Sequence, residues 1–409
     1  MKLRAWRWLA LSSVLFAALL CAATRPRYGG TLRMQLTDPL PLTESNALSH
    51  LVFETLVRLD ERGEPRLHLA SGWQHDAGFK RWNIYLRPGV NFHDGTPLNS
   101  ADAQASLVKA LPHVNVIAKQ QMLVIESETP RPDLLRALAE PRTAIARRTE
   151  SGLVGTGPFR WKDSTLAANE AHWGGRPFLD SIVFSPSGAV DVMQVPVGAT
   201  RRAVPESLTI WTSAPWELVA IQGIDSQPVI GQALSSSIDR AAIANVLTLG
   251  RGVPTGALLP QWLTGHAFLF TSPPDLQRAR QLLAGVRLMP LMLSYSSADP
   301  LAKAIAERVA VNARDAGISI QVSPLAPNPH LRLARVRIES LAHLAEEFGL
   351  GSADGSLYER ERAMLEGGRV IPLLHIPDVF GIHPRVRGWE DAHAGRDGRL
   401  HLEDVWIEP

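Results

Sequence analysis

The sequence contains little of what enzymes, metalloproteins and nucleic-acid-binding proteins commonly use. Cys21 is the only cysteine in 409 residues, which excludes an internal disulfide and any cluster of thiolate metal ligands. The 42 Lys and Arg residues against 40 Asp and Glu residues leave a net charge of +2, and no basic run is long enough to neutralise a row of phosphates. We therefore expect no nucleic acid partner.

Long hydrophobic runs are also scarce, and the one that stands out lies at the N-terminus. Lys2, Arg4 and Arg7 precede an uncharged, mostly apolar run over residues 8–23, which is the layout of a secretory signal peptide. The run is shorter than the roughly 20 residues that a membrane-spanning helix needs. We expect residues 1–23 to be a signal peptide and the protein to be periplasmic or otherwise extracytoplasmic, with a retained anchor as the alternative.

Cys21 stands at the end of this run, where a cysteine can be lipidated and so anchor a protein to the membrane. Leu20 precedes it, however, at a site where lipoprotein signals carry a small residue. Cleavage after Ala23, or a cysteine that is only part of the apolar run, are the alternatives, and the sequence leaves all of them open.

Motifs for catalysis and for cofactor binding are missing as well. The 13 histidines form no H-x-x-x-H or H-E-x-x-H array, and the nearest local set, His375 with Asp378 and His383, lies in a segment broken by proline. The glycines of residues 155–157 and 351–355 lack the spacing of a phosphate loop or dinucleotide fold, and G-x-S-x-G does not occur. We therefore predict no catalytic residue, no metal site and no cofactor.

Several segments carry the periodicity of helices and strands. Residues 31–36 suit a strand, and residues 82–87 alternate apolar and polar side chains as a half-buried strand does. Helices are expected from a cap at Ser45 or Asn46 to about residue 58, from a cap at Asn99 or Ser100, over residues 232–249 and over residues 272–284. Residues 200–216 are interpreted as strand and crossing segments between domains.

Residues 288–325 give the clearest supersecondary pattern. A strand, LMLSYSS, is followed by Asp299 and Pro300, a cap with proline at the first helical position, and then by a helix that stops at Gly317 before the strand ISIQV. Strand, helix and strand of this length predict a right-handed βαβ unit with parallel strands. The remaining picture is an exported α/β chain with two lobes.

His93 and Asp94 lie side by side in LRPGVNFHDGTPLNSADAQAS, at a predicted turn. An aspartate before a glycine usually accepts hydrogen bonds from its own backbone, so a structural turn is the favoured interpretation and a catalytic pair is the alternative. The tryptophans that follow the signal peptide also have two interpretations, because aromatic side chains either pack in a hydrophobic core or contact a small ligand between the lobes.

The order of these segments resembles that of the family 5 solute-binding proteins of bacterial ABC importers, the oligopeptide-, dipeptide- and nickel-binding group. The resemblance begins with GGTLRMQL and with LVFETLVRLDERGEPRLHLASGWQHD, which ends in an LA-x-x-W phrase. The stretch LRPGVNFHDGTPLNSADAQASL is similar to the signature of that family, in which the His-Asp-Gly turn belongs to the scaffold. Later segments follow in the family's order: VGTGPFRW, NEAHWGGRPFLDSI, ALSSSIDRAAIANVLTLGRGVP, DLQRARQLL and AIAERVAVNARDAGISIQV.

The resemblance implies a two-lobed, periplasmic-binding-protein-like α/β fold of type II, cluster C, with an extra subdomain in the first lobe. It places lobe I at residues 24–45, 151–217 and 375–409, the extra subdomain at residues 46–150, and lobe II at residues 218–374. The lobes of such a fold close about a hinge and enclose the ligand. The implied function is to capture a peptide or similar small solute and deliver it to the permease subunits of an ABC importer, as a monomer that makes and breaks no bond.

The same resemblance places a ligand against three parts of the chain: the loop of Thr37, Asp38, Pro39 and Leu40, the crossover near Trp211 and Trp216, and the strand end at Tyr295 and Ser296. Asp38 is the available anion for an amino group, and a solvated turn aspartate is the alternative. Peptide-binding members hold the ligand's amino terminus with an aspartate in a Trp-x-x-Asp-Tyr phrase.

That phrase has no counterpart here, because the corresponding residues 324–355 contain no tryptophan or tyrosine, and Asp354 stands in a glycine turn. Ile230 and Gly231 also replace the valine and arginine usual in the family. These departures leave a second hypothesis open, in which a degenerate member of the fold acts as an envelope interaction or sensor module.

Overall fold

The computed structural model describes most of the chain with side chains, in thirteen segments. These are residues 25–36, 48–60, 64–111, 113–150, 152–162, 165–185, 187–223, 228–270, 273–324, 326–338, 340–350, 355–390 and 399–408. Cys21, the loop from Thr37 to Leu40 and Asp354 lie outside them, so the predictions made for these residues stay predictions.

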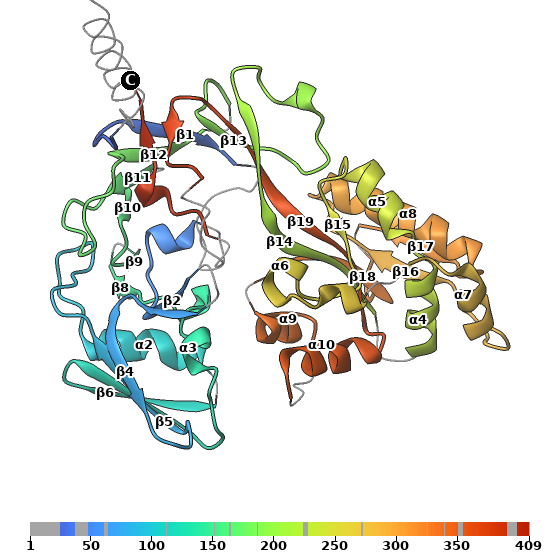
Figure 1. The fold of residues 1–409 in the computed structure, drawn as a ribbon, viewed down its shortest axis with the longest axis horizontal. Coiled ribbons are helices and arrows are strands. Elements are labelled where there is room, and N and C mark those ends of the chain that lie inside the picture. The colour runs from blue at the N-terminus through green and yellow to red at the C-terminus, as the bar shows by residue number, and fades with distance from the viewer. Residues whose placement is uncertain are drawn as a thin grey trace, which may run out of the picture.

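A long mixed sheet connects the two lobes (Figure 1). Its lobe I part has the strand order β10-β11-β12-β1-β13, and its lobe II part has the order β18-β16-β17. Between them run β14 (Thr209–Gly223) and β19 (Val370–Ile382), which are long enough to pass through both lobes. The shorter strands are β1 (Thr31–Gln35), β10 (Phe159–Lys162), β11 (Thr165–Ala168), β12 (Ser181–Phe184), β13 (Val192–Gln194), β15 (Val253–Pro254), β16 (Leu291–Ser294), β17 (Ile320–Ser323) and β18 (Leu331–Arg337).

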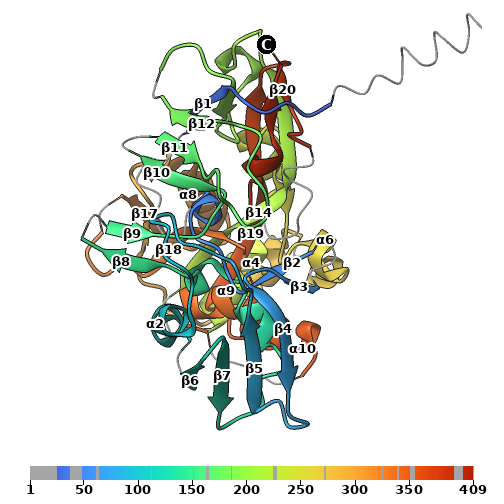
Figure 2. The same ribbon diagram turned by 90° about the vertical axis from the view of Figure 1, so that its left-hand side faces the viewer.

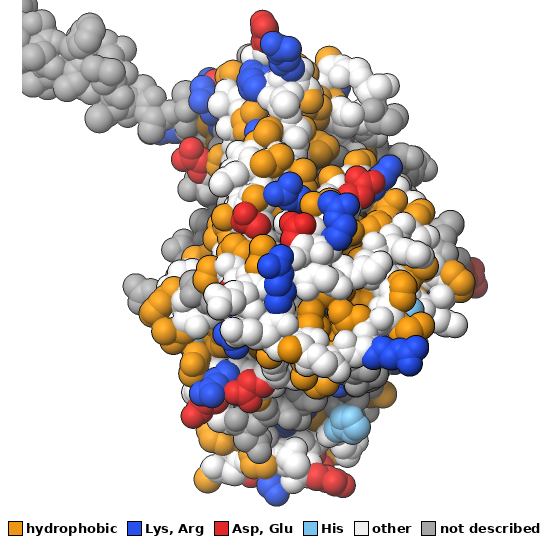
Figure 3. Space-filling view, turned by 90° about the vertical axis from the view of Figure 1, so that its right-hand side faces the viewer, with side chains coloured by type: hydrophobic (Ala, Val, Ile, Leu, Met, Phe, Trp, Pro, Cys, Tyr) orange, Lys and Arg blue, Asp and Glu red, His pale blue; other side chains and the backbone are white. Residues whose placement is uncertain are grey.

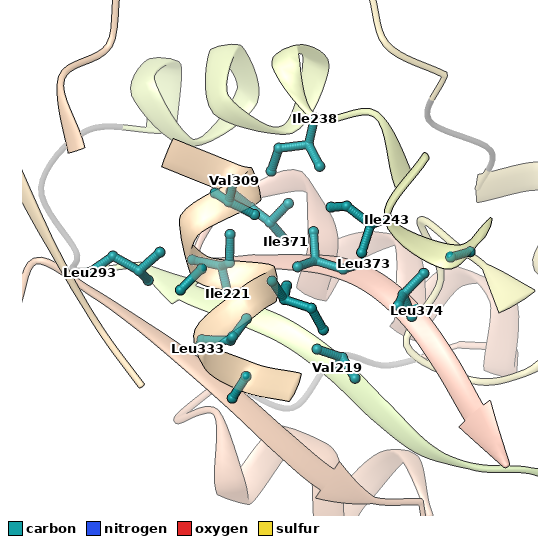
Figure 4. Packing of buried hydrophobic residues seen from close by; sticks show 14 of the residues in the cluster. Val219, Ile221, Ile238, Ile243, Leu293, Val309, Leu333, Ile371, Leu373 and Leu374 are labelled. Carbon is teal, nitrogen blue, oxygen red and sulfur yellow. The ribbon is translucent and has the colours of Figure 1, made fainter. Parts of the chain in front are cut away.

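Helices cover both faces of the lobe II part of the sheet. They are α4 (Pro228–Ser237), α5 (Arg240–Leu247), α6 (Gln261–Thr264), α7 (Leu276–Leu282), α8 (Pro300–Asp315), α9 (Leu341–Glu347) and α10 (Leu357–Glu366), with the 3-10 turn η4 (Ala267–Phe270). One face packs against α8, where buried aliphatic side chains of β14, β16, β18 and β19 meet Val309 (Figure 4). The other face packs against α9 and α10 through Leu218, Ala334 and Leu344.

A four-stranded antiparallel sheet, in the order β4-β5-β7-β6, forms the extra subdomain at the lower end of lobe I (Figure 2). Its strands are β4 (Ala70–His75), β5 (Arg81–Leu86), β6 (Val114–Lys119) and β7 (Met122–Ser127), and α2 (Ser100–Ala110) packs against it. The hairpin of β2 (Val57–Leu59) and β3 (Pro65–Leu67) and the helix α3 (Leu134–Ala137) complete the unit, and the hairpin of β8 (Arg147–Thr149) and β9 (Gly152–Val154) follows. This subdomain has a hydrophobic core of its own.

The strongest local predictions are confirmed. β16, α8 and β17 form the expected βαβ unit, with parallel pairing of β16 and β17 and with Asp299 accepting hydrogen bonds from the backbone N–H groups of Leu301 and Ala302. Asn99 caps α2, and β1 and β5 occupy the predicted strand positions. The helix predicted over residues 232–249 is instead two helices, because Asp239 leaves the helical path and caps α5 through Ala242 N.

The helix predicted from Ser45 or Asn46 to residue 58 is wrong. The described part of that segment holds only the 3-10 turn η1 (Ser49–Leu51) and the strand β2. Tertiary contacts override the helical periodicity, because the buried carboxylate of Glu54 accepts hydrogen bonds from Thr156 Oγ1 at 2.7 Å and Trp173 Nε1 at 3.0 Å and lies 3.1 Å from His172 Nε2. A helical turn at Glu54 would carry its carboxylate away from these donors.

Two further findings concern the helices and the surface. Among the described residues, no helix is long and apolar enough to cross a membrane. On the face of lobe II that carries α7 and α8, basic and acidic side chains are interspersed with hydrophobic ones (Figure 3). The subdomain, lobe I and lobe II each contain a separate hydrophobic cluster. The residue numbers predicted for the domain boundaries stay a prediction.

Candidate functional site

The two long strands that join the lobes lose their regular pairing where they cross from one lobe to the other. Residues 209–212 of β14 pair with β19 in lobe I and residues 217–222 pair with it in lobe II, but the register shifts on both sides of Pro215. Pro215 lies opposite Pro377, and neither residue has an N–H to donate to the ladder. The side chain of Ser213 accepts the N–H of Asp378 at 2.9 Å instead. We call this break between the lobes the hinge.

Lobe II also contacts the subdomain directly, beyond the hinge. Arg142, in the 3-10 turn η2 (Pro141–Thr143), donates to the carboxylate of Glu346 on α9 at 2.6 Å. The hydroxyl of Ser340, which caps α9, donates to the buried carboxylate of Glu140 at 3.0 Å. The side of lobe II that carries α6, α9 and α10 therefore faces lobe I and its subdomain (Figure 1). We call this side the interlobe face.

Strand alternation decides which residues of β14 belong to the interlobe face. Leu218 packs in the cluster with α9 and α10. Trp216 is two residues before Leu218 and therefore points to the same face of the sheet, whereas Glu217 and Val219 point to the α8 side. The ring of Trp216 lies edge-on to that of Trp262 on α6, with centroids 4.4 Å apart. Trp262 Nε1 donates to the carbonyl oxygen of Pro215 at 3.1 Å, so the aromatic pair is fastened to the hinge.

Trp211 lies further along β14, in the lobe I part of the sheet. Its ring is perpendicular to that of Trp389, with centroids 6.3 Å apart, and Trp389 in turn contacts Phe380. The structure thus brings the two predicted tryptophans onto one strand on either side of the hinge. Each stands in an aromatic cluster, and ligand contact by either residue stays a prediction.

Tyr295 and Ser296 lie elsewhere, at the carboxyl end of β16 on the α8 side of the sheet. They line a cavity of about 1210 Å³ between the crossing loop of residues 195–199, the start of α8 and the hinge. Its lining includes neither Trp211 nor Trp216. Among the described residues, Trp216 therefore lies on the opposite face of the long strands from Tyr295 and Ser296, and the ligand contacts predicted for all of these residues stay a prediction.

The cavity on the α8 side contains a charge network. Arg335 on β18 donates to Glu217 at 2.5 Å and to Asp299 at 2.7 Å. Burial by itself would lower the pKa of the Arg335 guanidinium, but the two carboxylates raise it above its usual value. Arg337 forms a further pair with Asp378 at 3.2 Å. The two guanidiniums and three carboxylates of this network sum to a charge of −1, and their ion pairs tie β14, β18 and β19 to Asp299 at the start of α8.

His93 and Asp94 form the structural turn that the sequence favours, and their side chains contact backbone and hydroxyl groups of the turn and of a neighbouring segment. His93 Nε2 lies 3.0 Å from the carbonyl oxygen of Gly157, and burial lowers the pKa of the imidazole. Asp94 accepts from the backbone N–H of Thr96 at 2.9 Å and from the hydroxyl of the same residue. The pair fastens the turn of the subdomain to the segment around Gly157.

Sequence reasoning missed Trp262, the partner of Trp216, and the network of Glu217, Asp299 and Arg335. A signal for the network was present in β18, where Arg335 and Arg337 alternate with buried apolar residues as the more exposed positions of a half-buried strand do. Trp262 gave no local signal, because α6 has four residues and follows an irregular segment.

The hinge strands, the two α/β lobes and the contact across them define a two-lobed solute-binding fold. Residues 64–195 and 226–349, more than half of the chain, match the family described as "Bacterial extracellular solute-binding proteins, family 5 Middle". The protein belongs to this family.

Curated relatives match over part of their length. The uncharacterized protein YhjP of Bacillus subtilis is 31% identical over 180 residues, which are 39% of this chain and 31% of that protein. The glutathione-binding protein GsiB of Salmonella typhimurium is 25% identical over 290 residues, 59% of this chain and 57% of that protein. The chain therefore spans well under two thirds of the length of these relatives.

Solved structures match over nearly the whole chain. The oligopeptide-binding protein AppA from Bacillus subtilis, in complex with a nonapeptide, has a TM-score of 0.76 at 16% identity. The match covers 94% of this chain and 100% of that chain. DppA from Helicobacter pylori, in complex with the peptide STSA, has a TM-score of 0.77 at 16% identity, with 94% of this chain and 99% of that chain covered. The predicted two-lobed, periplasmic-binding-protein-like fold is confirmed.

Proposed function

We propose that this protein is the extracytoplasmic solute-binding component of an ABC importer. It captures a peptide or similar small solute between its lobes and delivers it to a membrane permease, as a monomer without enzymatic activity. The observation that carries the proposal is the hinge at Pro215 and Pro377 together with the contact of Arg142 and Glu346, because a protein that encloses a ligand needs both a pivot and surfaces that meet on closure.

The ligand in this proposal lies on the interlobe face, beside Trp262, and contacts lobe I through the loop of Thr37, Asp38, Pro39 and Leu40. Trp262 is half-buried, so its ring can lose further exposed area against a solute, whereas Trp216 is only 5% exposed and supports Trp262 from behind. Aromatic walls of this kind supply most of the contact area in small-ligand sites. The structures in complex with a nonapeptide and with the peptide STSA support a peptide as the solute.

Thermal shift of the purified chain against di- to pentapeptides tests the proposal, because a ligand of the folded state raises Tm with its concentration. For the peptide that stabilises the protein, Trp262→Ala is expected to weaken binding about tenfold or more, as loss of a central aromatic anchor does. Trp161→Ala removes an exposed tryptophan of β10 and is the matched control. Full affinity of Trp262→Ala would place the solute elsewhere, and Tyr295→Phe and Ser296→Ala test the cavity on the α8 side.

A second function, that of a sensor or interaction module, has one observation in its favour. The HTH-type transcriptional regulator SgrR of Photorhabdus laumondii is 32% identical over 165 residues, which are 36% of this chain, so a related segment occurs in a regulator. A protein that binds no peptide in the thermal shift assay, but is captured from its own envelope with a partner other than a permease, would favour this function.

A further inference from the structure

Two histidines and a glutamate from opposite ends of the chain meet in lobe I. His50 belongs to η1, and His401 and Glu403 belong to the segment around the 3-10 turn η6 (Leu402–Asp404). One possible ligand atom from each of the three lies within 4.8 Å of the other two. Because about 350 residues separate the histidines, no local spacing pattern reports this cluster.

A hydrogen bond to a backbone carbonyl orients the imidazole of His50, as such bonds orient the histidine ligands of metal sites. His50 Nε2 lies 2.8 Å from the carbonyl oxygen of Leu400, and since a carbonyl can only accept, Nε2 carries the proton. The lone pair of the neutral imidazole is then on Nδ1. A metal-binding histidine almost always donates its other N–H to such an acceptor, which fixes the tautomer and the ring plane.

Glu403 supplies an independent observation. Its Oε1 lies 3.0 Å from His401 Nδ1, but its Oε2 is a buried atom that accepts no hydrogen bond from any described residue. A buried carboxylate oxygen without a partner is costly, and a bound cation is one of the few groups that remove the cost.

The backbone around the cluster is held firmly. Leu48 and Leu51 flank His50, and Leu400, Leu402 and Val405 flank the other two residues, and all five are buried in the core of lobe I. The rings of His50 and His401 contact each other in an edge-to-face arrangement, with centroids 5.2 Å apart and an interplanar angle of 65°. The donors are therefore preorganised from opposite sides, which lowers the cost of assembling a site on binding.

We propose that His50, His401 and Glu403 bind one divalent transition-metal ion, of the class of Zn²⁺ or Ni²⁺, and thereby fasten the N-terminal segment of lobe I to its C-terminal segment. Two imidazoles with one carboxylate suit these ions, whereas Ca²⁺ and Mg²⁺ prefer sites made of oxygen alone. Zinc bonds to such ligands are about 2.0–2.2 Å long and tetrahedral, which places two donors roughly 3.5 Å apart, so binding draws the partly exposed side chains of His401 and Glu403 closer to His50.

The site is separate from the solute site proposed above. None of its three residues lines the cavity on the α8 side, and all three belong to lobe I, whereas Trp262 belongs to lobe II. The ion has three protein ligands and retains a coordination position for water. Its effect is on the stability of lobe I, and peptide binding and metal binding can be measured independently.

Calorimetric titration of the chelator-treated, tag-free chain with Zn²⁺ or Ni²⁺ tests the proposal. We expect one ion per chain at micromolar concentration, a Tm that rises until one equivalent is bound, and little response to Mg²⁺ or Ca²⁺. His401→Ala and Glu403→Gln are each expected to abolish the binding and the rise in Tm. His330→Ala, which removes an exposed histidine of lobe II, is the matched control and should bind as the parent does.

Circular dichroism and peptide thermal shifts of the same variants show whether each is folded. A folded His401→Ala or Glu403→Gln protein that still binds one Zn²⁺ would overturn the assignment, and so would a parent chain that binds neither Zn²⁺ nor Ni²⁺ at micromolar concentration. Loss of peptide binding with intact metal binding would count against the proposed function alone. Should Glu403→Gln fail to fold, His50→Gln serves as the second variant.

Discussion

The guanidinium of Arg142 lies 2.6 Å from the carboxylate of Glu346, so a residue of the subdomain forms an ion pair with a helix of lobe II. Arg142 also donates to Glu140 at 2.7 Å, and Glu140 accepts from Ser340 of lobe II. The contact joins parts of the chain about 200 residues apart and lies away from the hinge. It is a direct polar contact between lobe II and the subdomain of lobe I.

The ion pair should affect the balance between open and closed lobes more than it affects folding. Glu346 is 65% exposed, and exposed ion pairs contribute about 1 kcal/mol or less. Arg142→Ala is therefore expected to increase the open population and to weaken solute binding about fivefold or less. Small-angle scattering without ligand should give a larger radius of gyration.

Arg136→Ala is the control for that experiment, because Arg136 pairs at 3.5 Å with Glu64 and both residues are in the subdomain. It should leave the radius of gyration unchanged. Identical scattering from Arg142→Ala and the parent would show that the pair does not hold the lobes together.

The carboxylate of Glu54 should be essential for stability. Burial by itself would raise its pKa, but hydrogen bonds from His172 and His68 hold the pKa well below its usual range, so the group is ionised in the folded protein. Glu54→Gln places an amide N–H₂ among groups that themselves donate. We expect the free energy of unfolding to fall on the order of 3 kcal/mol in urea denaturation. Glu64→Gln, an exposed change, should cost little, and equal losses in the two variants would contradict the role given to Glu54.

His375 should make the protein less stable in mild acid. It lies buried on β19 with Nε2 3.1 Å from the carbonyl oxygen of Leu258, and burial lowers its pKa from 6.5 to about 4. The unfolded chain takes up the proton near pH 6.5 and the folded protein only near pH 4, so this contribution is fully present above pH 6.5 and is lost as the pH falls through that window. The loss is about 1.4 kcal/mol per pH unit.

The variant His375→Gln keeps an N–H donor for Leu258 and cannot be protonated. Its stability should fall less steeply between pH 6.5 and pH 4 than that of the parent in urea denaturation followed by circular dichroism. Parallel slopes in the two proteins would show that His375 is not the responsible group.

Gly155 should tolerate no side chain. A Cβ there would lie 1.9 Å from the carbonyl oxygen of Val52, which is backbone and part of a packed segment. Gly155→Ala must therefore displace the contact between this segment and the His93 turn, which includes the hydrogen bond from His93 N to Gly155 O at 2.9 Å. We expect a loss on the order of 3 kcal/mol or more. In Gly72→Ala, where the nearest atom is 3.8 Å away, Tm should change by no more than a few degrees.

Local chemistry explains which parts of the fold could be predicted. Asp299, Pro300 and Gly317 mark the ends of α8 by capping and backbone preference, and those effects operate within one or two turns of chain. The segment around Glu54 could not be predicted in the same way, because the carboxylate finds its donors about 15 to 120 residues away along the chain. Helical periodicity was present there, and long-range hydrogen bonds outweighed it.

The sequence by itself determined the family, the βαβ unit, the caps of α2 and α8 and the turn at His93, since each follows from residues close together or from an ordered series of motifs. Only the tertiary structure decided that Trp216 and Tyr295 lie on opposite faces of the long strands, that Trp216 meets Trp262, and that His50 meets His401 and Glu403. Successive residues of a strand point to opposite faces of the sheet, so the face of each residue depends on how the strand is placed. The hinge forms only when Pro215 and Pro377, more than 150 residues apart in the chain, lie opposite each other. Neither relation is contained in any local stretch of the chain.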